Sequence, residues 1–362
     1  MKKVIMIAGG GTGGHIYPGI AVARALQEIE PSVEVFFVGT RSGLESKILG
    51  KENLPLFLIE GGKLNFSGAP LTKLISLLKL PLGFFQSVFL LLKYRPSFVL
   101  GVGGYASGPF VLAATLLGFR SAIWEANAYP GMANRWLSRF VHQCFLVFEE
   151  TKAYLHCRNY QVVGVPVRHQ LGQSAGGSQK RSSETNGEFH LLHYGGSQGS
   201  RAIGRTLCEA ILTKHEWTKN LKVVHQTGSI DYQDFLTRYQ GHESTVEIKE
   251  FIYDMPQYYL WADLVLCRGG ASTMNELAAF GLPAIVIPLP AADGHQEKNA
   301  QVLVQSEAAH MILQRDLTPD RLVAEIQSLR QNPDEREKLK KNIRKFFRPQ
   351  AAEEIAKALL AR

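Results

Sequence analysis

Two glycine-rich stretches decide the fold, GGGTGG at residues 9–14 and GGSQG at residues 195–199. Each follows a short apolar run of strand length, Val4–Ala8 in the first case and His190–Tyr194 in the second. A segment with helical spacing follows each turn, and the order strand, glycine turn, helix is typical of a Rossmann-like domain. Because this opening occurs twice, half a chain apart, we expect two such domains in tandem.

The rest of the chain repeats the alternation of short apolar runs and helical segments, which predicts an α/β protein with parallel sheets covered by helices. The further predicted strands are Val33–Val38, Ser97–Leu100, Ser121–Trp124, Lys222–Gln226, Thr245–Lys249, Leu264–Cys267 and Ala284–Ile287. A length of 362 residues with 45% hydrophobic content suits two globular cores.

The boundary between the domains is expected near the middle of the chain. Gln170–Glu188 is rich in Gly, Ser, Gln and charge, a composition typical of a loop or linker. We place the hinge just before it, at Gly164–Pro166. The expected domains are residues 1–165 and 166–342, with a C-terminal amphipathic helix, about 343–362, packing back on the first.

The overall charge is basic, with 40 Lys and Arg against 32 Asp and Glu and a net charge of +8. That balance suits an anionic membrane surface or phosphorylated substrates, and no recognisable module points to nucleic acid. The four cysteines lack zinc-site spacing and are expected to be free thiols in a reducing cytosol. The apolar run Val4–Ala8 is too short for the core of a signal peptide, so we expect a cytosolic protein.

The first glycine turn satisfies the pattern G-x-G-x-x-G, which lets backbone amides approach an anionic ligand at a helix start. A dinucleotide-binding domain would also carry an acid at the end of its second strand, about 20 residues on. Here that strand ends in Phe37-Val38-Gly39-Thr40, which disfavours NAD or FAD. His15, after the last glycine, either faces the ligand or is a helix-start histidine with a satisfied hydrogen bond.

The second half carries three candidate ligand-binding segments. The turn with Gly196, Ser197 and Gln198 predicts a diphosphate cradle of amides, a hydroxyl and a helix start. The segment CRGGASTMNE at residues 267–276 predicts a strand, a glycine turn and a helix whose Glu276 accepts ribose hydroxyls. The polar stretch at residues 293–299, with Gln296 and Asn299, follows a predicted strand, where open α/β sheets bind ligands.

No D-x-D motif occurs in the chain, although enzymes that hold a sugar-nucleotide diphosphate through a metal generally use one. Amides, helix dipoles and Arg168 would have to balance the diphosphate charge. We therefore expect no cofactor and a metal-independent mechanism.

Residues 71–92 are strongly apolar at helical spacing, with lysines at the edges. Pro81 and internal polar residues make a membrane-spanning helix improbable. Part of this surface belongs to a core, but there are more large apolar residues than one buried face can hold. We expect a membrane-docking patch that includes Leu74, Leu78, Lys79, Phe85 and Lys93.

Taken in order along nearly the whole chain, these motifs resemble the MurG family of N-acetylglucosaminyltransferases. The landmarks are GGGTGGHIYP (9–18), GVGGYASGP (101–109), GVPVR (164–168), GGSQGSR (195–201), FIYDM (251–255) and RGGASTMNELAAFGLPAIVIP (268–288). The resemblance implies the GT-B fold, with two Rossmann-like domains whose parallel sheets face across a cleft. It implies inverting transfer of GlcNAc from UDP-GlcNAc to the MurNAc C4 hydroxyl of undecaprenyl-pyrophosphoryl-MurNAc-pentapeptide (lipid I), giving lipid II for peptidoglycan synthesis.

The resemblance also implies a place in the cell: a peripheral protein on the cytoplasmic face of the bacterial inner membrane, beside other cell-wall synthesis proteins. The residues that match the family's donor site are Arg168, Ser197, Phe251, Ile252, Ala271, Ser272, Thr273, Met274, Asn275, Glu276 and Gln296. Those that match the acceptor side are Thr12, Gly13, Gly14, His15, Glu125 and Asn127. His15 is the first candidate for the catalytic base and Glu125 the second.

Two departures from the family pattern affect these expectations. The family often has His-Glu-Gln-Asn where this chain has Trp124-Glu125-Ala126-Asn127, and Asn275 stands where Ser is common. The alternatives are another GT-B glycosyltransferase with a different lipid or small-molecule acceptor, a UDP-GlcNAc epimerase, an NAD-dependent oxidoreductase and a catalytically silent membrane scaffold.

Overall fold

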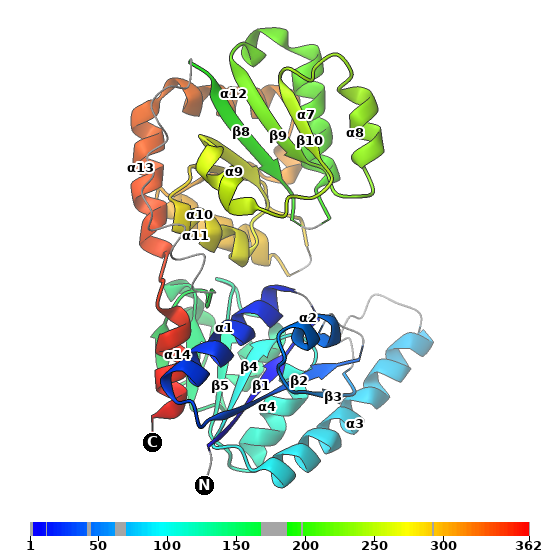
Figure 1. The fold of residues 1–362 in the computed structure, drawn as a ribbon, viewed down its shortest axis with the longest axis vertical. Helices are drawn as coiled ribbons and strands as arrows, with labels where there is room; N and C mark the ends of the chain where they lie inside the picture. The colour runs from blue at the N-terminus through cyan, green and yellow to red at the C-terminus, as the bar shows by residue number, and fades with distance from the viewer. Residues whose placement is uncertain are drawn as a thin grey trace. The chain divides into compact units, whose positions relative to one another are not determined.

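The computed structural model describes residues 3–11, 13–41, 45–61, 70–167, 187–196, 198–291 and 293–361, without the side chains of residues 47, 70–80 and 215. The chain divides into two compact units, Met1–Arg168 with Arg348–Arg362, and His169–Phe347. We call them the N-terminal and C-terminal units. Each has its own parallel sheet with helices on both faces (Figure 1).

The N-terminal unit contains a seven-stranded sheet in the order β3-β2-β1-β4-β5-β6-β7. The strands are β1 (Val4–Gly9), β2 (Glu34–Thr40), β3 (Leu56–Ile59), β4 (Phe98–Gly103), β5 (Ser121–Glu125), β6 (Gln143–Leu146) and β7 (Tyr160–Val162). The strand order reverses between β1 and β4, which pair in parallel. In open α/β sheets ligands bind at the carboxyl ends of the strands at such a reversal.

The helices of this unit form two layers because successive strand residues point to opposite faces of the sheet. The helical elements are α1 (Gly13–Ile29), α2 (Glu45–Lys51), α3 (Pro70–Tyr94), α4 (Ser107–Leu116), α5 (Met132–Leu137), η1 (Glu149–Tyr154) and α14 (Ala351–Leu360). Ile5 and Ile7 of β1 pack with α1 and α14, while Met6 and Ala8 pack with residues of α3 and α4. Figure 1 shows α14, the last helix of the chain, lying beside α1.

The C-terminal unit contains a six-stranded sheet in the order β10-β9-β8-β11-β12-β13. The strands are β8 (Phe189–Tyr194), β9 (Leu221–Gln226), β10 (Val246–Lys249), β11 (Leu264–Cys267), β12 (Ala284–Val286) and β13 (His310–Met311). Its strand order reverses between β8 and β11, which pair in parallel. The turns after these two strands are the second glycine turn and the Gly269–Gly270 turn.

Two helical layers cover this sheet in the same way. The helical elements are α7 (Arg201–Thr213), η2 (His215–Thr218), α8 (Tyr232–Arg238), α9 (Met255–Trp261), α10 (Ala271–Phe280), α11 (His295–Gln305), η3 (Gln314–Asp316), α12 (Pro319–Gln331), α13 (Pro333–Ile343) and η4 (Arg344–Phe346). Leu191 of β8 packs in a cluster with residues of α7 and α12, whereas Leu192 and Tyr194 pack with residues of α9 and α10.

The chain returns to the N-terminal unit between Phe347 and Arg348, later than the residue 343 expected from the sequence. The reason is local packing, because Ile343, Phe346 and Phe347 join the apolar cluster of the C-terminal unit. The first crossing lies between Arg168 and His169, against 165/166 expected. Most of the expected linker, Gln170–Glu188, lies outside the described residues.

Candidate active-site residues in two units

The first glycine turn of the N-terminal unit packs directly against the turn that follows β4. The Gly10 amide donates to the Gly103 carbonyl at 3.2 Å. Gly104 has φ +82°, and a Cβ there would lie 2.1 Å from the Gly10 carbonyl oxygen. A Cβ on Gly103 would lie 2.7 Å from the His15 ring. These glycines therefore allow two turns and a histidine ring to meet at the sheet's reversal point.

A buried carboxylate that the sequence analysis overlooked braces the same turn. Glu45 of α2 is 1% exposed, and its Oε1 accepts from the amides of Gly11 at 3.0 Å and Thr40 at 3.2 Å. The Gly10 and Gly11 amides are thus both engaged within the protein, so they do not form the open anion cradle that the glycine pattern suggested. The amides of Gly13 and Gly14 begin α1 at the end of this turn, and Thr12 lies outside the described residues.

The His15 ring lies against Gly103, close enough to Glu125 of β5 for their charges to interact. Burial lowers its pKa below the ordinary value, while the negative charge of Glu125, a hydrogen bond to the Gly10 backbone and the charge of Glu45 act in the opposite direction. An imidazole with a lowered pKa is neutral at physiological pH. His15 is therefore in the protonation state that a general base requires.

Both oxygens of Glu125 are already occupied by hydrogen-bond donors. Oε1 accepts from the Asn127 amide at 2.9 Å and from Asn127 Nδ2 at 3.2 Å, and Oε2 accepts from the Gly131 amide at 3.0 Å and from Asn134 Nδ2 at 2.8 Å. The side chain is 4% exposed. This geometry suits a carboxylate that shapes the loop after β5 and acts on His15 through its charge, more than one that takes a proton from a substrate.

Trp124, one of the departures from the family pattern, has a structural partner. Its buried indole Nε1 donates to the Gly164 carbonyl at 3.1 Å, at the segment where the sequence placed the hinge. Asn127 is fixed from both sides, because its carbonyl also accepts from Thr151 Oγ1 at 3.0 Å. The described contacts thus anchor the whole loop after β5.

The second glycine turn, in the C-terminal unit, interlocks with the turn after β9. A Cβ on Gly199, at φ +73°, would lie 1.9 Å from the Thr227 carbonyl oxygen, and Gln226 Nε2 donates to the Gly196 carbonyl at 3.0 Å. Gly196 and Gln198 are exposed at the start of α7. Ser197, the predicted hydroxyl of this cradle, lies outside the described residues, as does Arg168.

The helix α10 begins immediately after Gly270 and presents its first turn at the carboxyl end of β11. Ala271 and Thr273 are half-buried and Ser272 is exposed, whereas the side chains of Met274 and Asn275 point into the core. For these last two, only backbone atoms are placed to contact a ligand. The first turn of α10 therefore offers amides and the Ser272 hydroxyl, while the Thr273 side chain has a hydrogen bond with Tyr194.

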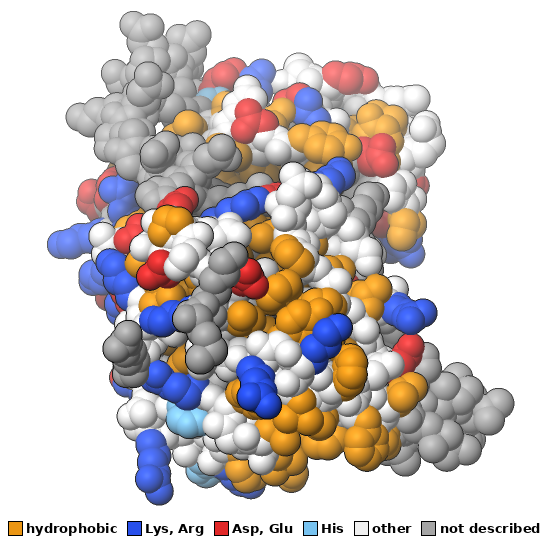
Figure 2. Space-filling view, turned by 60° about the horizontal axis from the view of Figure 1, so that its bottom comes forward, with side chains coloured by type: hydrophobic (Ala, Val, Ile, Leu, Met, Phe, Trp, Pro, Cys, Tyr) orange, Lys and Arg blue, Asp and Glu red, His pale blue; other side chains and the backbone are white. Residues whose placement is uncertain are grey.

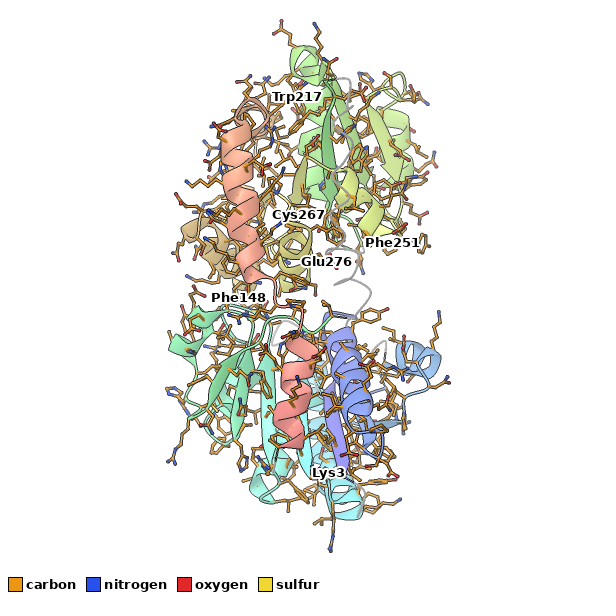
Figure 3. The ribbon with its side chains drawn as sticks, turned by 60° about the vertical axis from the view of Figure 1, so that its left-hand side comes forward. Lys3, Phe148, Trp217, Phe251, Cys267 and Glu276 are labelled. Carbon is orange, nitrogen blue, oxygen red and sulfur yellow. The ribbon has the colours of Figure 1, made fainter. Side chains whose placement is uncertain are left out.

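Glu276 of α10 lies within a chain of hydroxyl groups. The Tyr259 hydroxyl donates to Glu276 Oε2 at 2.5 Å, and the hydroxyls of Tyr259 and Tyr194 are 2.9 Å apart. Burial raises the pKa of Glu276, and the hydrogen bond from Tyr259 opposes that rise. Figure 3 shows Glu276 and Phe251 toward one end of the C-terminal unit, with Trp217 at its other end.

Gln296 and Asn299 of α11 both brace the turn after β11. Gln296 Oε1 accepts from the amides of Gly269 at 3.1 Å and Leu289 at 3.0 Å, which leaves its Nε2 without a hydrogen bond to any described residue. Asn299 is 0% exposed and its Nδ2 donates to the Gly269 carbonyl at 3.1 Å. Gln296 thus keeps a donor for a ligand, whereas the buried side chain of Asn299 supports the turn.

The loop after β10 holds Phe251 and Ile252, two of the residues that match the family's donor site. Phe251 is 42% exposed and contacts Tyr253 edge-on, with ring centroids 4.8 Å apart. The Ile252 side chain is 5% exposed. A planar ligand would therefore contact the exposed Phe251 ring and the backbone of Ile252.

An apolar surface on the N-terminal unit surrounds the exposed side of α3. Its members, which we call the α3 patch, are Leu82, Phe85, Phe89, Met132 and Trp136, each at least 50% exposed. A hollow of about 730 Å³ between α3, α4 and α5 is lined by Phe85, Met132, Trp136 and other apolar residues. Figure 2 shows hydrophobic side chains gathered on the lower face, with Lys and Arg near them.

Lys93, one of the two lysines expected here, lies beside this surface, with its Nζ 5.8 Å from the centre of the Phe89 ring. Phe85 is 67% exposed. The side chains of Leu74, Leu78 and Lys79 lie outside the described part of the chain. Among the described residues, no helix is both long enough and apolar enough to cross a bilayer.

Family models match both units. The glycosyltransferase family 28 N-terminal domain matches residues 5–146, and the C-terminal domain of the same family matches residues 190–355. A UDP-N-acetylglucosamine--N-acetylmuramyl-(pentapeptide) pyrophosphoryl-undecaprenol N-acetylglucosamine transferase of Bdellovibrio bacteriovorus is 54% identical over 360 residues, 99% of each chain. This chain belongs to the MurG family of glycosyltransferases.

Other relatives agree with the assignment to the MurG family. A Myxococcus xanthus protein of the same name is 40% identical over 357 residues, covering 98% of this chain and 92% of the relative. The crystal structure of Acinetobacter baumannii MurG matches with a TM-score of 0.79 and 28% identity over 99% of both chains. A UDP-N-acetylglucosamine 2-epimerase, at a TM-score of 0.67 and 13% identity over 99% of this chain and 96% of its own, shares the fold alone. The GT-B class predicted from the sequence is confirmed.

Proposed function

We propose that this chain transfers GlcNAc from UDP-GlcNAc to the MurNAc C4 hydroxyl of lipid I and so produces lipid II for peptidoglycan synthesis. The observation that carries this function is the 54% identity, over 99% of both chains, to a transferase whose name states this donor sugar and acceptor. The residues that match the family's donor site lie in the C-terminal unit, apart from Arg168 at the domain boundary. Those that match the acceptor side lie in the N-terminal unit.

In the C-terminal unit, the start of α7 and its exposed turn bind the donor diphosphate. Amides at a helix N-terminus stabilise negative charge without a metal. Glu276 accepts hydrogen bonds from the ribose, the backbone of Ile252 contacts the uracil edge, and Gln296 donates from its Nε2 to a GlcNAc hydroxyl. Among the described residues, no group of three or more His, Cys, Asp and Glu side chains is arranged to hold a metal ion, and metal independence is part of this proposal.

In the N-terminal unit, His15 takes the proton of the acceptor's C4 hydroxyl while that oxygen attacks C1 of GlcNAc. The bond between C1 and the phosphate oxygen breaks, and UDP leaves with the bonding electron pair. One displacement of this kind inverts the anomeric carbon. The lowered pKa of His15 keeps the imidazole neutral at pH 7, and the nearby Glu125 carboxylate stabilises the imidazolium that forms.

The α3 patch brings the enzyme to its lipid-linked acceptor. Exposed aromatic side chains next to cations bind the interface of an anionic bilayer, because the rings enter the headgroup region and the cations attract the lipid charge. Peripheral binding to the cytoplasmic face of the inner membrane follows from this proposal, and contact with other cell-wall synthesis proteins stays a prediction from the resemblance.

Transfer of radiolabel from UDP-GlcNAc to a short-chain lipid I analogue tests the function. We expect label in the lipid fraction, unchanged by chelator, and little label from UDP-GalNAc. Binding of UDP-GlcNAc without labelled lipid would contradict the acceptor assignment and leave the donor site in place. Loss of activity with chelator would contradict metal independence alone.

A further inference from the structure

Three hydroxyl-bearing or acidic side chains from separate elements meet beneath the proposed ribose site. Tyr194 is the last residue of β8, directly before the second glycine turn, Tyr259 lies on α9, and Glu276 lies on α10. The 2.5 Å contact between Tyr259 and Glu276 Oε2 is in the range of charge-assisted hydrogen bonds. Nothing in the proposed mechanism uses either tyrosine.

The two tyrosines are held rigidly. Tyr259 is 2% exposed and Tyr194 is 5% exposed, and the Tyr259 ring packs against Phe280 with centroids 5.1 Å apart. Burial raises the pKa of both phenols well above their ordinary value, so both keep their protons. Since Tyr259 gives its single proton to the carboxylate, its oxygen is left to accept one from Tyr194. The chain of hydroxyls therefore runs from Tyr194, which also has a hydrogen bond with the Thr273 side chain, through Tyr259 to Glu276.

Only one carboxylate oxygen is engaged in this way. Oε2 accepts from Tyr259, and Oε1 receives no hydrogen bond from any described residue. A carboxylate on a half-buried helix face would otherwise rotate or take up a proton, because burial disfavours its charged form. The hydrogen bond from Tyr259 opposes both the rotation and the protonation of Glu276, and it leaves Oε1 as the acceptor for a ligand.

We propose that Tyr259 is a positioning residue that fixes Glu276 through Oε2 and reserves Oε1 for the ribose hydroxyls of the donor, with Tyr194 orienting the Tyr259 hydroxyl. This inference rests on the proposed function in one respect, the role of Glu276 as the ribose ligand. Because Tyr194 directly precedes the diphosphate turn, the same chain of hydroxyls connects the turn that holds the diphosphate with the residue that selects ribose.

The test compares UDP with 2′,3′-dideoxy-UDP, which lacks both ribose hydroxyls. Calorimetric titrations use the full-length protein and its Tyr259→Phe and Tyr194→Phe variants, with Tyr258→Phe as the matched control on the same helix. Phenylalanine keeps the ring that fills the core, and thermal melting checks that each variant folds. Glu276→Gln gives the affinity expected when the ionised ribose ligand is absent.

We expect Tyr259→Phe to weaken UDP binding about tenfold at pH 7, the effect of one hydrogen bond to a charged group, and to leave 2′,3′-dideoxy-UDP binding within twofold. Tyr194→Phe should give a smaller loss in the same direction, and Tyr258→Phe none. The loss in Tyr259→Phe should grow as the pH falls, because the unsupported carboxylate takes up a proton at higher pH than in the wild type.

Two results would overturn the inference while the proposed function stands: equal weakening of both nucleotides, which is the mark of a packing defect, or no weakening of UDP. Failure of the wild-type protein to bind UDP would overturn the proposed function and this inference together. A wild type that binds both nucleotides equally would show that Glu276 does not contact ribose, and would overturn this inference too.

Discussion

Acid pH should destabilise the C-terminal unit through His193, a histidine buried at the centre of its sheet. The side chain is 0% exposed, and its Nδ1 lies 3.0 Å from the Leu266 carbonyl oxygen, so Nδ1 carries the proton. Nε2 is buried and has no hydrogen-bond partner in the part of the chain that the structure describes. The His225 ring lies 4.8 Å away, and the positive charge of Arg268 also acts on His193. A second proton would therefore be buried without an acceptor, beside another histidine.

Burial lowers the pKa of His193 to about 4, against an ordinary value of about 6.5 in the unfolded chain. The unfolded state takes up a proton as the pH falls below 6.5, and the folded state does so only near pH 4. The stabilisation is thus complete above pH 6.5 and is lost as the pH falls toward 4, at about 1.4 kcal/mol per pH unit. Between pH 7 and pH 5 the loss is about 2 kcal/mol.

The His193→Asn variant isolates this contribution, because its amide can still donate to Leu266 but cannot titrate. We expect the free energy of unfolding of the C-terminal unit to fall by about 2 kcal/mol more in the wild type than in the variant between pH 7 and pH 5. Unfolding in urea is followed by hydrogen exchange in peptides from β8 and β9. The cost of the smaller side chain cancels in this difference. Equal losses in the two proteins would refute the reasoning.

Three further outcomes follow from the N-terminal unit. His15→Ala should lower turnover about 10²- to 10⁴-fold with UDP affinity unchanged, and near-normal turnover in the lipid I assay would remove His15 from the role of base. Glu125→Gln should lower the free energy of unfolding by about 2 to 4 kcal/mol, because two of the four donors to Glu125 lose their acceptor. The same variant should move the acidic limb of the pH–rate profile to lower pH. An unmoved limb would contradict the effect of the Glu125 charge on His15. Phe85→Glu with Phe89→Glu should weaken binding to phosphatidylglycerol vesicles at least about tenfold, whereas Ile230→Glu, 72% exposed on the C-terminal unit, should not; equal effects would argue against the α3 patch.

The longer parallel strands of the fold could be predicted from apolar runs because both faces of such strands are buried. Leu264–Cys267 occupies the predicted residues, the other predicted strands differ at their ends by one to a few residues, and the C-terminal helix, expected at about 343–362, spans Ala351–Leu360. The strands β3, β6, β7 and β13 were missed. They have two to four residues each, and β3, β7 and β13 are edge strands whose residues are mostly half-buried, so their apolar pattern is weak.

The candidate site was predictable as segments but not as individual atoms. Glycine turns and helix starts can be recognised from their residue types, whereas the hydrogen bond from the Gly11 amide to Glu45 depends on a helix 34 residues further along the chain. The bracing role of Asn299 and the contact between Tyr259 and Glu276 likewise arise from packing between elements. No residue pattern predicts these contacts, because each of these side chains would also suit an ordinary position on a helix.

Transfer of GlcNAc to lipid I is best tested by identifying, by NMR, every sugar product formed from UDP-GlcNAc and a lipid I analogue. We expect equal amounts of UDP and a lipid-linked disaccharide in which GlcNAc is joined to the MurNAc C4 oxygen through an inverted, β-anomeric linkage. Release of UDP with no lipid-linked disaccharide, a different linkage, or conversion of UDP-GlcNAc to its 2-epimer would contradict it.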